Sequence, residues 1–188
     1  MRLFVAILLD EPVRLGLKRV QEHLTPGCSG VRWVRWDQLH VTLKFLGEVR
    51  DGDVPKVCSA VTEAAATLPA FDMTLRGTGC FPPRGLVRIV WAGIDEPTGT
   101  VVRLAEAVEN RLADLGFPRE QRPFSPHITI GRVKEDHSNG GIRRAVGAGS
   151  FAALPQAVER IAVMASVLAR EGPTYSIVSR ANLSGGRG

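Results

Sequence analysis

A four-residue motif occurs twice in this chain, and its repetition limits the possible folds more than any other feature of the sequence. Residues 40–43 read His-Val-Thr-Leu, and residues 127–130 read His-Ile-Thr-Ile. Both copies lie in runs of alternating apolar residues, "LHVTLKFLG" and "PHITIGRV". Such alternation predicts β-strands, in which side chains two residues apart point to the same face. The fold must therefore accommodate two equivalent strands.

Alternation separates each motif strand into a core face and a second face. His40 and Thr42 share one face, and His127 and Thr129 share the corresponding face of the other strand. The apolar residues between and after them belong to the core. Each strand should therefore carry one His/Thr pair on its non-core face.

The same rule places the residues that follow each motif. Lys44 should lie on the His/Thr face, either as a positive charge for a ligand or as an ordinary solvated lysine, and Phe45 should lie in the core. Arg132 should lie on the face opposite His127, unless the strand bends or ends near Gly131.

Apolar periodicity along the rest of the chain predicts strands that alternate with helices. The expected strands cover 2–9, 39–46, 71–82, 86–94, 127–133, 157–169 and 174–178, and the expected helices cover 11–24, 53–68, 97–115 and a short basic segment around 143–144. His127 follows His40 by 87 residues (127 − 40), which is near half of the 188-residue chain. These features predict an α+β protein of mostly antiparallel sheet, with two pseudo-symmetric lobes in a single domain over 1–183 and a disordered tail over 184–188.

Composition limits the class of protein. Apolar residues make up 44% of the chain and charged residues 23%, which is typical of a folded globular protein. The net charge of +5 favours a polyanionic partner, whereas an aromatic content of 6% argues against a broad platform for single-stranded nucleic acid. Three cysteines without a C-x-x-C pattern, and no long apolar run, indicate a cytoplasmic protein that does not enter a membrane.

Two histidines and two threonines suit one kind of chemistry. A neutral His can take a proton from water while a protonated His gives one to a leaving oxygen, as in-line displacement at phosphorus requires. Threonine hydroxyls can bind the phosphate oxygens between them. A metal site would need a third ligand at a recognisable spacing, and neither motif has one nearby. The motifs therefore indicate acid/base catalysis on a phosphate ester, with no metal or cofactor.

The paired motifs and their surroundings resemble a known family. The segments "RLFVAILLD", "LHVTLKFLGEV", "LRGTGCFPPRGLVRIVWAGI" and "FSPHITIGRV" look like the RNA 2′,3′-cyclic phosphodiesterase branch of the two-histidine phosphoesterases, also called the 2′-5′ RNA ligase family. The similarity extends from Arg2 to about Tyr175.

The resemblance implies two lobes with outer helices and an active-site cleft between them, and a metal-independent opening of a ribose 2′,3′-cyclic phosphate to a 2′-phosphate. His127 would be the general base on water and His40 the general acid on the 3′ oxygen. Thr42 and Thr129 would hold the phosphate. Arg132 matches a basic residue of the family that would bind phosphate as well, and Lys44 remains a possible addition.

Two alternatives remain open at this stage. The same site could join RNA ends through a 2′-5′ link, with a 5′-hydroxyl in place of water, or the chain could be a non-catalytic module that binds RNA ends or nucleotides. A module of that kind would not need both histidines. The sequence favours a hydrolase that acts on RNA ends or nucleotides with a 2′,3′-cyclic phosphate, and we expect it to be a monomer.

Overall fold

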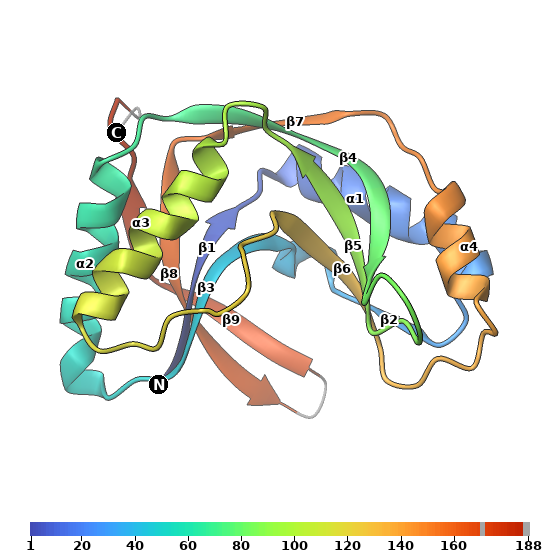
Figure 1. Cartoon of the computed structure of the whole chain (residues 1–188), viewed down its shortest axis with the longest axis horizontal. Coiled ribbons are helices and arrows are strands. Elements are labelled where there is room, and N and C mark those ends of the chain that lie inside the picture. Colours follow the sequence, from blue (N-terminus) through green and yellow to red (C-terminus); the bar gives the residue numbers. More distant parts are fainter. Residues whose placement is uncertain (170–171, 186–188) are drawn as a thin grey trace.

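One curved antiparallel sheet organises the molecule (Figure 1). The structure, a computed structural model, describes residues 1–169 and 172–185. Over these residues nine strands form the sheet in the order β7-β4-β5-β6-β3-β1-β8-β9, and β2 pairs with β6 in addition. The strands are β1 (Arg2–Leu8), β2 (Val31–Trp33), β3 (His40–Glu48), β4 (Phe71–Phe81), β5 (Ile89–Asp95), β6 (His127–Val133), β7 (Leu154–Val158), β8 (Arg160–Ala169) and β9 (Gly172–Asn182).

The strand order shows two matched halves. From the centre outward, one half runs β3-β1-β8-β9 and the other runs β6-β5-β4-β7. The two motif strands, β3 and β6, are therefore the central pair, and each begins at its motif histidine. This arrangement confirms the expected α+β fold with two pseudo-symmetric lobes.

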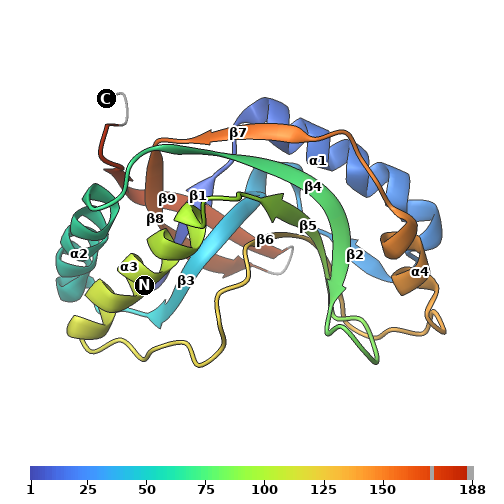
Figure 2. The same ribbon diagram turned by 45° about the horizontal axis from the view of Figure 1, so that its top comes forward.

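Helices cover each lobe on the outside, and Figure 2 shows them as two pairs at opposite ends of the molecule. The helices are α1 (Glu11–Leu24), α2 (Val54–Ala66), α3 (Thr100–Asp114) and α4 (Gly141–Ala148). Helix α2 contacts α3, β8 and β9, while α1 contacts β6 and β7 and α4 contacts β4. Although α1 directly follows β1, it packs on the lobe of β6, so each lobe depends on chain segments from both halves.

The first strand separates two apolar layers. Leu3, Val5 and Ile7 are at most 1% exposed and belong to the main core beneath the helices. The residues between them, Phe4 and Ala6, belong to a smaller cluster with neighbours from β8. Because successive side chains of a strand point to opposite faces, this cluster lies on the face of the sheet that the main core does not use.

The end of the described chain departs from the expected tail. Ser184 donates its backbone N–H to Leu68 O (2.8 Å) and accepts a hydrogen bond from Ala70 N (3.1 Å), so this residue is held against the strand that begins at Phe71. The remainder of the predicted tail, residues 186–188, lies outside the described residues. No helix in the described part of the chain is long and apolar enough to cross a membrane.

Candidate active site

The two motifs meet at the centre of the sheet. Strands β3 and β6 are paired antiparallel through Val41 and Ile128, whose side chains are fully buried. Antiparallel register about this pair aligns His40 with Thr129 and Thr42 with His127. All four of these side chains are half-buried. The structure therefore brings the two predicted His/Thr pairs together on one face, related by a pseudo-two-fold axis.

Each histidine is held in the same way. His40 Nδ1 lies 2.7 Å from Gln38 O, and His127 Nδ1 lies 2.8 Å from Ser125 O. A carbonyl oxygen only accepts hydrogen bonds, so Nδ1 carries the hydrogen in both rings. The other nitrogen, Nε2, then has a lone pair in the neutral imidazole. Both histidines are thus prepared to exchange a proton through Nε2.

Aromatic rings flank both imidazoles. The His40 ring lies 5.0 Å from the Phe4 ring and 5.4 Å from the ring of Tyr175, which meets it edge-on. The His127 ring lies 5.2 Å from Phe81, which contacts Trp91 at 5.5 Å. Sequence reasoning missed Phe4 and Tyr175, although alternation along β1 does separate Phe4 from its core neighbours. Phe81 and Trp91 are both half-buried rather than in the core.

The electrostatic environment of His40 disfavours its protonated form. Burial lowers the pKa of His40, and the positive charge of Arg132 lowers it further, while the Gln38 carbonyl works in the opposite direction. Burial also raises the pKa of Tyr175, against the opposing effect of Arg132 and Arg2. The charge of Arg132 therefore acts on the groups around His40, across the seam between the lobes.

A β-bulge explains how Arg132 reaches this side. In the pairing with β5, Arg132 and Gly131 are in register, but the next matched residue is Thr129, so Ile130 has no partner. An extra residue of this kind reverses the alternation beyond it. Arg132 is exposed, and Val133 is buried on the core side. The expectation from strict alternation was therefore wrong, and the predicted exception, a bend near Gly131, is correct.

One buried side chain from α1 holds this bulge. Gln21 is 6% exposed and donates from Nε2 to Ile130 O and to Val34 O, each at 2.8 Å. The backbone N–H of Val34 also donates to Ile130 O, at 2.9 Å. The carbonyl of the unmatched residue is therefore fixed by two donors, one of them from a segment 109 residues away.

Strand β3 has a bulge at the same motif position. In its pairing with β1, Lys44 and Thr42 are in register with neighbouring residues of β1, and Leu43 between them has no partner. The bulge turns Lys44 inward, where it is 7% exposed, and turns Phe45 outward, where it is 69% exposed. The sequence-based placements of Lys44 at the cleft and of Phe45 in the core were both wrong, because the rule assumed a regular strand.

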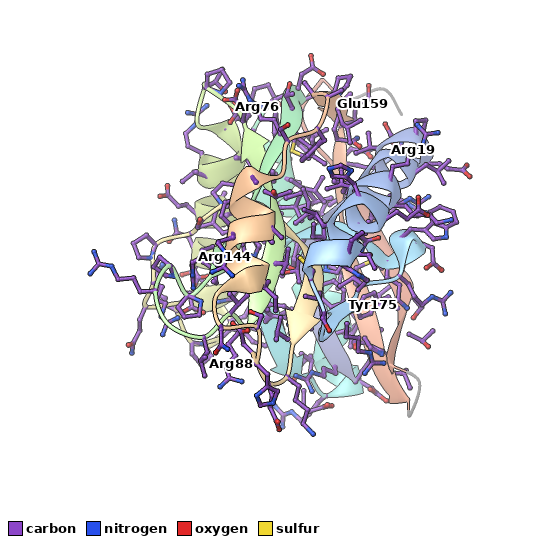
Figure 3. The ribbon with its side chains drawn as sticks, turned by 90° about the vertical axis from the view of Figure 1, so that its right-hand side faces the viewer. Arg19, Arg76, Arg88, Arg144, Glu159 and Tyr175 are labelled. Atoms are coloured by element: carbon purple, nitrogen blue, oxygen red, sulfur yellow. The ribbon has the colours of Figure 1, made fainter. Side chains whose placement is uncertain are left out.

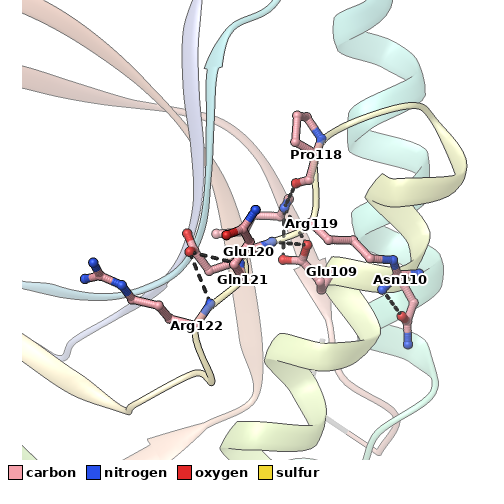
Figure 4. A network of polar contacts seen from close by, with 8 residues as sticks. Glu109, Asn110, Pro118, Arg119, Glu120, Gln121 and Arg122 are labelled. Atoms are coloured by element: carbon pink, nitrogen blue, oxygen red, sulfur yellow. Dashed lines mark hydrogen bonds and ion pairs between the residues drawn. The ribbon is translucent and has the colours of Figure 1, made fainter.

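Lys44 instead anchors a loop that leads to the second motif. Figure 4 shows this loop, with Pro118 and Glu120 beside Glu109 of α3. Its Nζ donates to both carboxylate oxygens of Glu109 (2.8 and 2.9 Å) and to Pro118 O (2.8 Å). Glu109 Oε1 also accepts from the backbone N–H of Glu120 at 3.0 Å. Since this loop connects α3 to His127, the first motif strand helps to position the second.

The wall beside His127 is also fixed from a distance. Arg143 of α4, the predicted short basic helix, donates to the carbonyl oxygens of Pro82 (3.1 Å), Pro83 (2.9 Å) and Gly85 (2.8 Å), just after Phe81. Figure 3 views this end of the molecule, where the next residue, Arg144, is labelled.

Two glycines shape the same wall. Gly77 lies at a register shift of β4, with φ +70°. The Trp91 ring covers Gly79 so closely that a Cβ there would lie 2.0 Å from it. In the glycine-rich stretch, Gly79 therefore makes room for an aromatic ring.

Titratable side chains elsewhere do not form a metal site in the described residues. Across 1–169 and 172–185, no three His, Cys, Asp or Glu side chains gather closely enough to hold an ion.

A sheet of two matched halves with one His-x-Thr motif from each at the seam is the architecture of a two-histidine phosphoesterase. The family model described as "LigT like Phosphoesterase" matches residues 7–91 and 93–175. The chain belongs to this family.

Individual relatives agree with this classification. An RNA 2′,3′-cyclic phosphodiesterase of Archaeoglobus fulgidus is 36% identical over 176 residues, which cover 93% of this chain and 96% of the relative. The crystal structure of TT0787 of Thermus thermophilus is similar with a TM-score of 0.85 and 33% identity, and the match covers both chains fully. E. coli LigT complexed with 3′-AMP gives a TM-score of 0.74 at 28% identity, with 97% of each chain covered.

Proposed function

We propose that this protein is an RNA 2′,3′-cyclic phosphodiesterase that opens terminal cyclic phosphates to 2′-phosphates without a metal ion. The observation that carries the proposal is the matched pair of histidines, each with Nδ1 bonded to the carbonyl two residues before it and Nε2 left for proton exchange. The names of the relatives support the substrate class.

In the proposed reaction, the two histidines act on opposite sides of the phosphorus atom. His127 Nε2 accepts a proton from water as the water oxygen bonds to phosphorus. The bond from phosphorus to O3′ breaks, and the His40 imidazolium donates its proton to O3′. The ribose then carries a 3′-hydroxyl and a 2′-phosphate, and one proton has passed from His40 to the substrate while His127 has gained one.

The negative charge of the phosphate needs donors throughout this step. Thr42 and Thr129 lie on the histidine face, where their hydroxyls can donate to the non-bridging oxygens. Arg132, turned to the same face by the bulge in β6, supplies a permanent positive charge and planar donors suited to phosphate. Lys44 has no such role, because its ammonium group is bonded to Glu109 on the other side of the strand.

The acid role of His40 agrees with its surroundings once substrate is bound. In the free protein, burial and the charge of Arg132 favour the neutral ring. A cyclic phosphate carries one negative charge, and an opposite charge nearby favours the protonated form of a histidine. Substrate binding therefore offsets Arg132 and promotes the protonation that the acid step requires.

Hydrolysis of a nucleoside 2′,3′-cyclic monophosphate in excess EDTA tests the proposal. We expect turnover that the chelator does not change, with the 2′-phosphate as the product resolved by chromatography. Loss of activity in EDTA would contradict the metal-independent mechanism. No turnover of the mononucleotide or of a short RNA with a cyclic-phosphate end would contradict the enzymatic function. Addition of an RNA with a 5′-hydroxyl end, with a search for joined product, measures the ligase alternative.

A further inference from the structure

A second arginine lies directly beside Arg132. In the antiparallel pairing of β2 with β6, Arg32 is in register with Arg132. Side chains of directly opposite residues stand on the same face of a sheet, with Cβ atoms about 5 Å apart. Both arginines are exposed. Two arginine side chains therefore start next to each other, just beyond the second motif.

The neighbours of Arg32 in β2 fix the face on which it lies. Val31 and Trp33 both pack against the main core. Both also cover Gly131, where a Cβ would lie 2.6 Å from Val31 and 3.1 Å from the Trp33 ring. Because successive side chains of a strand point to opposite faces, Arg32 is turned away from the core. It therefore shares the face of Arg132 and of the motif histidines.

The guanidinium group of Arg32 reaches the first residues of β9. A Cβ at Gly172 would lie 3.1 Å from Arg32 Nη2. The next residue, Pro173, accepts a hydrogen bond from Gln38 Nε2 at 2.7 Å. Gln38 is also the residue whose carbonyl oxygen holds the His40 ring. Arg32 therefore extends from the side of the second motif strand toward the segment that positions the first histidine.

One cyclic phosphate does not need both arginines. It carries a single negative charge, and the two motif threonines and Arg132 already provide its donors in the proposed reaction. Like charges directly opposite each other destabilise a sheet, and a ligand with two anionic groups would relieve this repulsion between Arg32 and Arg132. The end of an RNA chain is such a ligand. Its last ribose carries the cyclic phosphate and is joined through O5′ to the phosphodiester of the preceding nucleotide.

We propose that Arg32 binds the phosphodiester on the 5′ side of the terminal nucleotide, so that the site prefers RNA ends to free nucleoside cyclic phosphates. This inference rests on the proposed function and names its substrate class more closely. The planar guanidinium group suits the two non-bridging oxygens of a phosphodiester. A contact to the backbone carries no base information, so the subsite accepts any sequence.

Two substrates that differ only at O5′ test the subsite. The first is adenosine 2′,3′-cyclic monophosphate, and the second carries in addition a methyl phosphate at O5′, which mimics the preceding phosphodiester. We expect the wild-type protein to have a kcat/KM about 10-fold higher for the second substrate, mainly through KM, and Arg32→Gln to lose this preference. Arg132→Gln should weaken the binding of both substrates and keep the preference, because its phosphate is common to both. Arg19→Gln removes the same charge from an exposed position on α1 and should keep the preference as well.

A wild-type protein without the preference, or an Arg32→Gln variant that keeps it, would overturn the subsite. An equal loss of preference in Arg19→Gln would also overturn it, because overall charge would then explain the effect. Calorimetric binding of adenosine 2′-monophosphate, with and without the methyl phosphate at O5′, makes the same comparison without turnover. If the wild-type protein hydrolysed neither substrate, the proposed function would fail, while tighter binding of the O5′-substituted compound that Arg32→Gln abolishes would still support the subsite. Equal binding of the two compounds by the wild-type protein would contradict it.

Discussion

The two motif strands, β3 and β6, share a backbone irregularity but differ in the side chains around it. Each has a bulge at the fourth residue of its motif, Leu43 in β3 and Ile130 in β6, and a buried polar side chain beside each bulge forms hydrogen bonds to a distant segment of the chain. In β3 this is the charged Lys44, bonded to Glu109, whereas in β6 it is the neutral amide of Gln21, bonded to Ile130 O. Beyond the bulges, different residues, Phe45 and Arg132, are exposed at equivalent positions of the two strands. A repeated motif can therefore share its backbone geometry while the residue that follows each copy has different chemistry.

The largest effect should come from removing what the two strands have in common. We expect His40→Ala and His127→Ala each to reduce kcat by at least about 10²-fold, because each removes one proton-transfer partner. Circular dichroism should show that the fold is kept. His23→Ala, which changes an exposed histidine of α1, is the control and should keep full activity. Near wild-type turnover in either motif variant would refute the paired mechanism.

The next largest effect should come from breaking the buried ion pair between Lys44 of β3 and Glu109. Lys44→Met leaves the Glu109 carboxylate, only 19% exposed, without its ammonium partner. We expect the free energy of unfolding in urea to fall by about 3 kcal/mol. The double variant Lys44→Met with Glu109→Leu should recover part of this loss. Lys56→Met, at an exposed ion pair, should cost no more than about 1 kcal/mol. A loss at Lys44 no larger than at Lys56 would show that the buried network contributes little.

The hydrogen bond from Gln21 to Ile130 O of β6 should affect substrate binding more than proton transfer. In Gln21→Met the carbonyl of Ile130 loses one of its two donors, and Arg132 loses its fixed position. We expect KM to rise about 10-fold with kcat changed less, since a displaced arginine weakens a charge-assisted contact to phosphate. The pKa of His40, measured by NMR, should rise, because the charge of Arg132 lowers it in the native protein.

Two further variants separate this effect from general destabilisation. Arg132→Gln should give the same changes as Gln21→Met, and the double variant should show less than the sum. Gln156→Met is the matched control, since Gln156 of β7 is also a buried glutamine (3% exposed) but is hydrogen-bonded to Asp10 rather than to the bulge. It should lower stability without raising KM. A KM in Gln21→Met no higher than in Gln156→Met would contradict the positioning role.

The two bulges also limit what could be predicted from the sequence. Alternation placed His40, Thr42, His127 and Thr129 on one face correctly, because each bulge comes after the threonine of its motif. It misplaced Lys44, Phe45 and Arg132, which follow the bulges. One unpaired residue reverses the face of every later side chain, and whether a residue is unpaired depends on the register with the neighbouring strand.

The aromatic neighbours of His40 could not be predicted from the sequence for a related reason. Tyr175 comes from a strand 135 residues further along the chain (175 − 40), and curvature of the whole sheet brings it to the imidazole. Local patterns thus predict which face of a strand the candidate residues occupy, whereas their surroundings depend on how distant strands pair.

The smallest expected effect tests the burial of His40. Because the pKa of His40 is lowered in the folded protein, the unfolded chain binds that proton more readily. Stability should therefore decline as the pH falls through the ordinary histidine value of about 6.5 toward the lowered one, and be fully present above it. In His40→Gln this part of the pH dependence should disappear, whereas His23→Gln, at an exposed site, should keep it. Urea unfolding at pH 7.5 and pH 5.5 measures the difference. If His40→Gln lost as much stability between these pH values as the wild-type protein, the burial of His40 would not control its protonation.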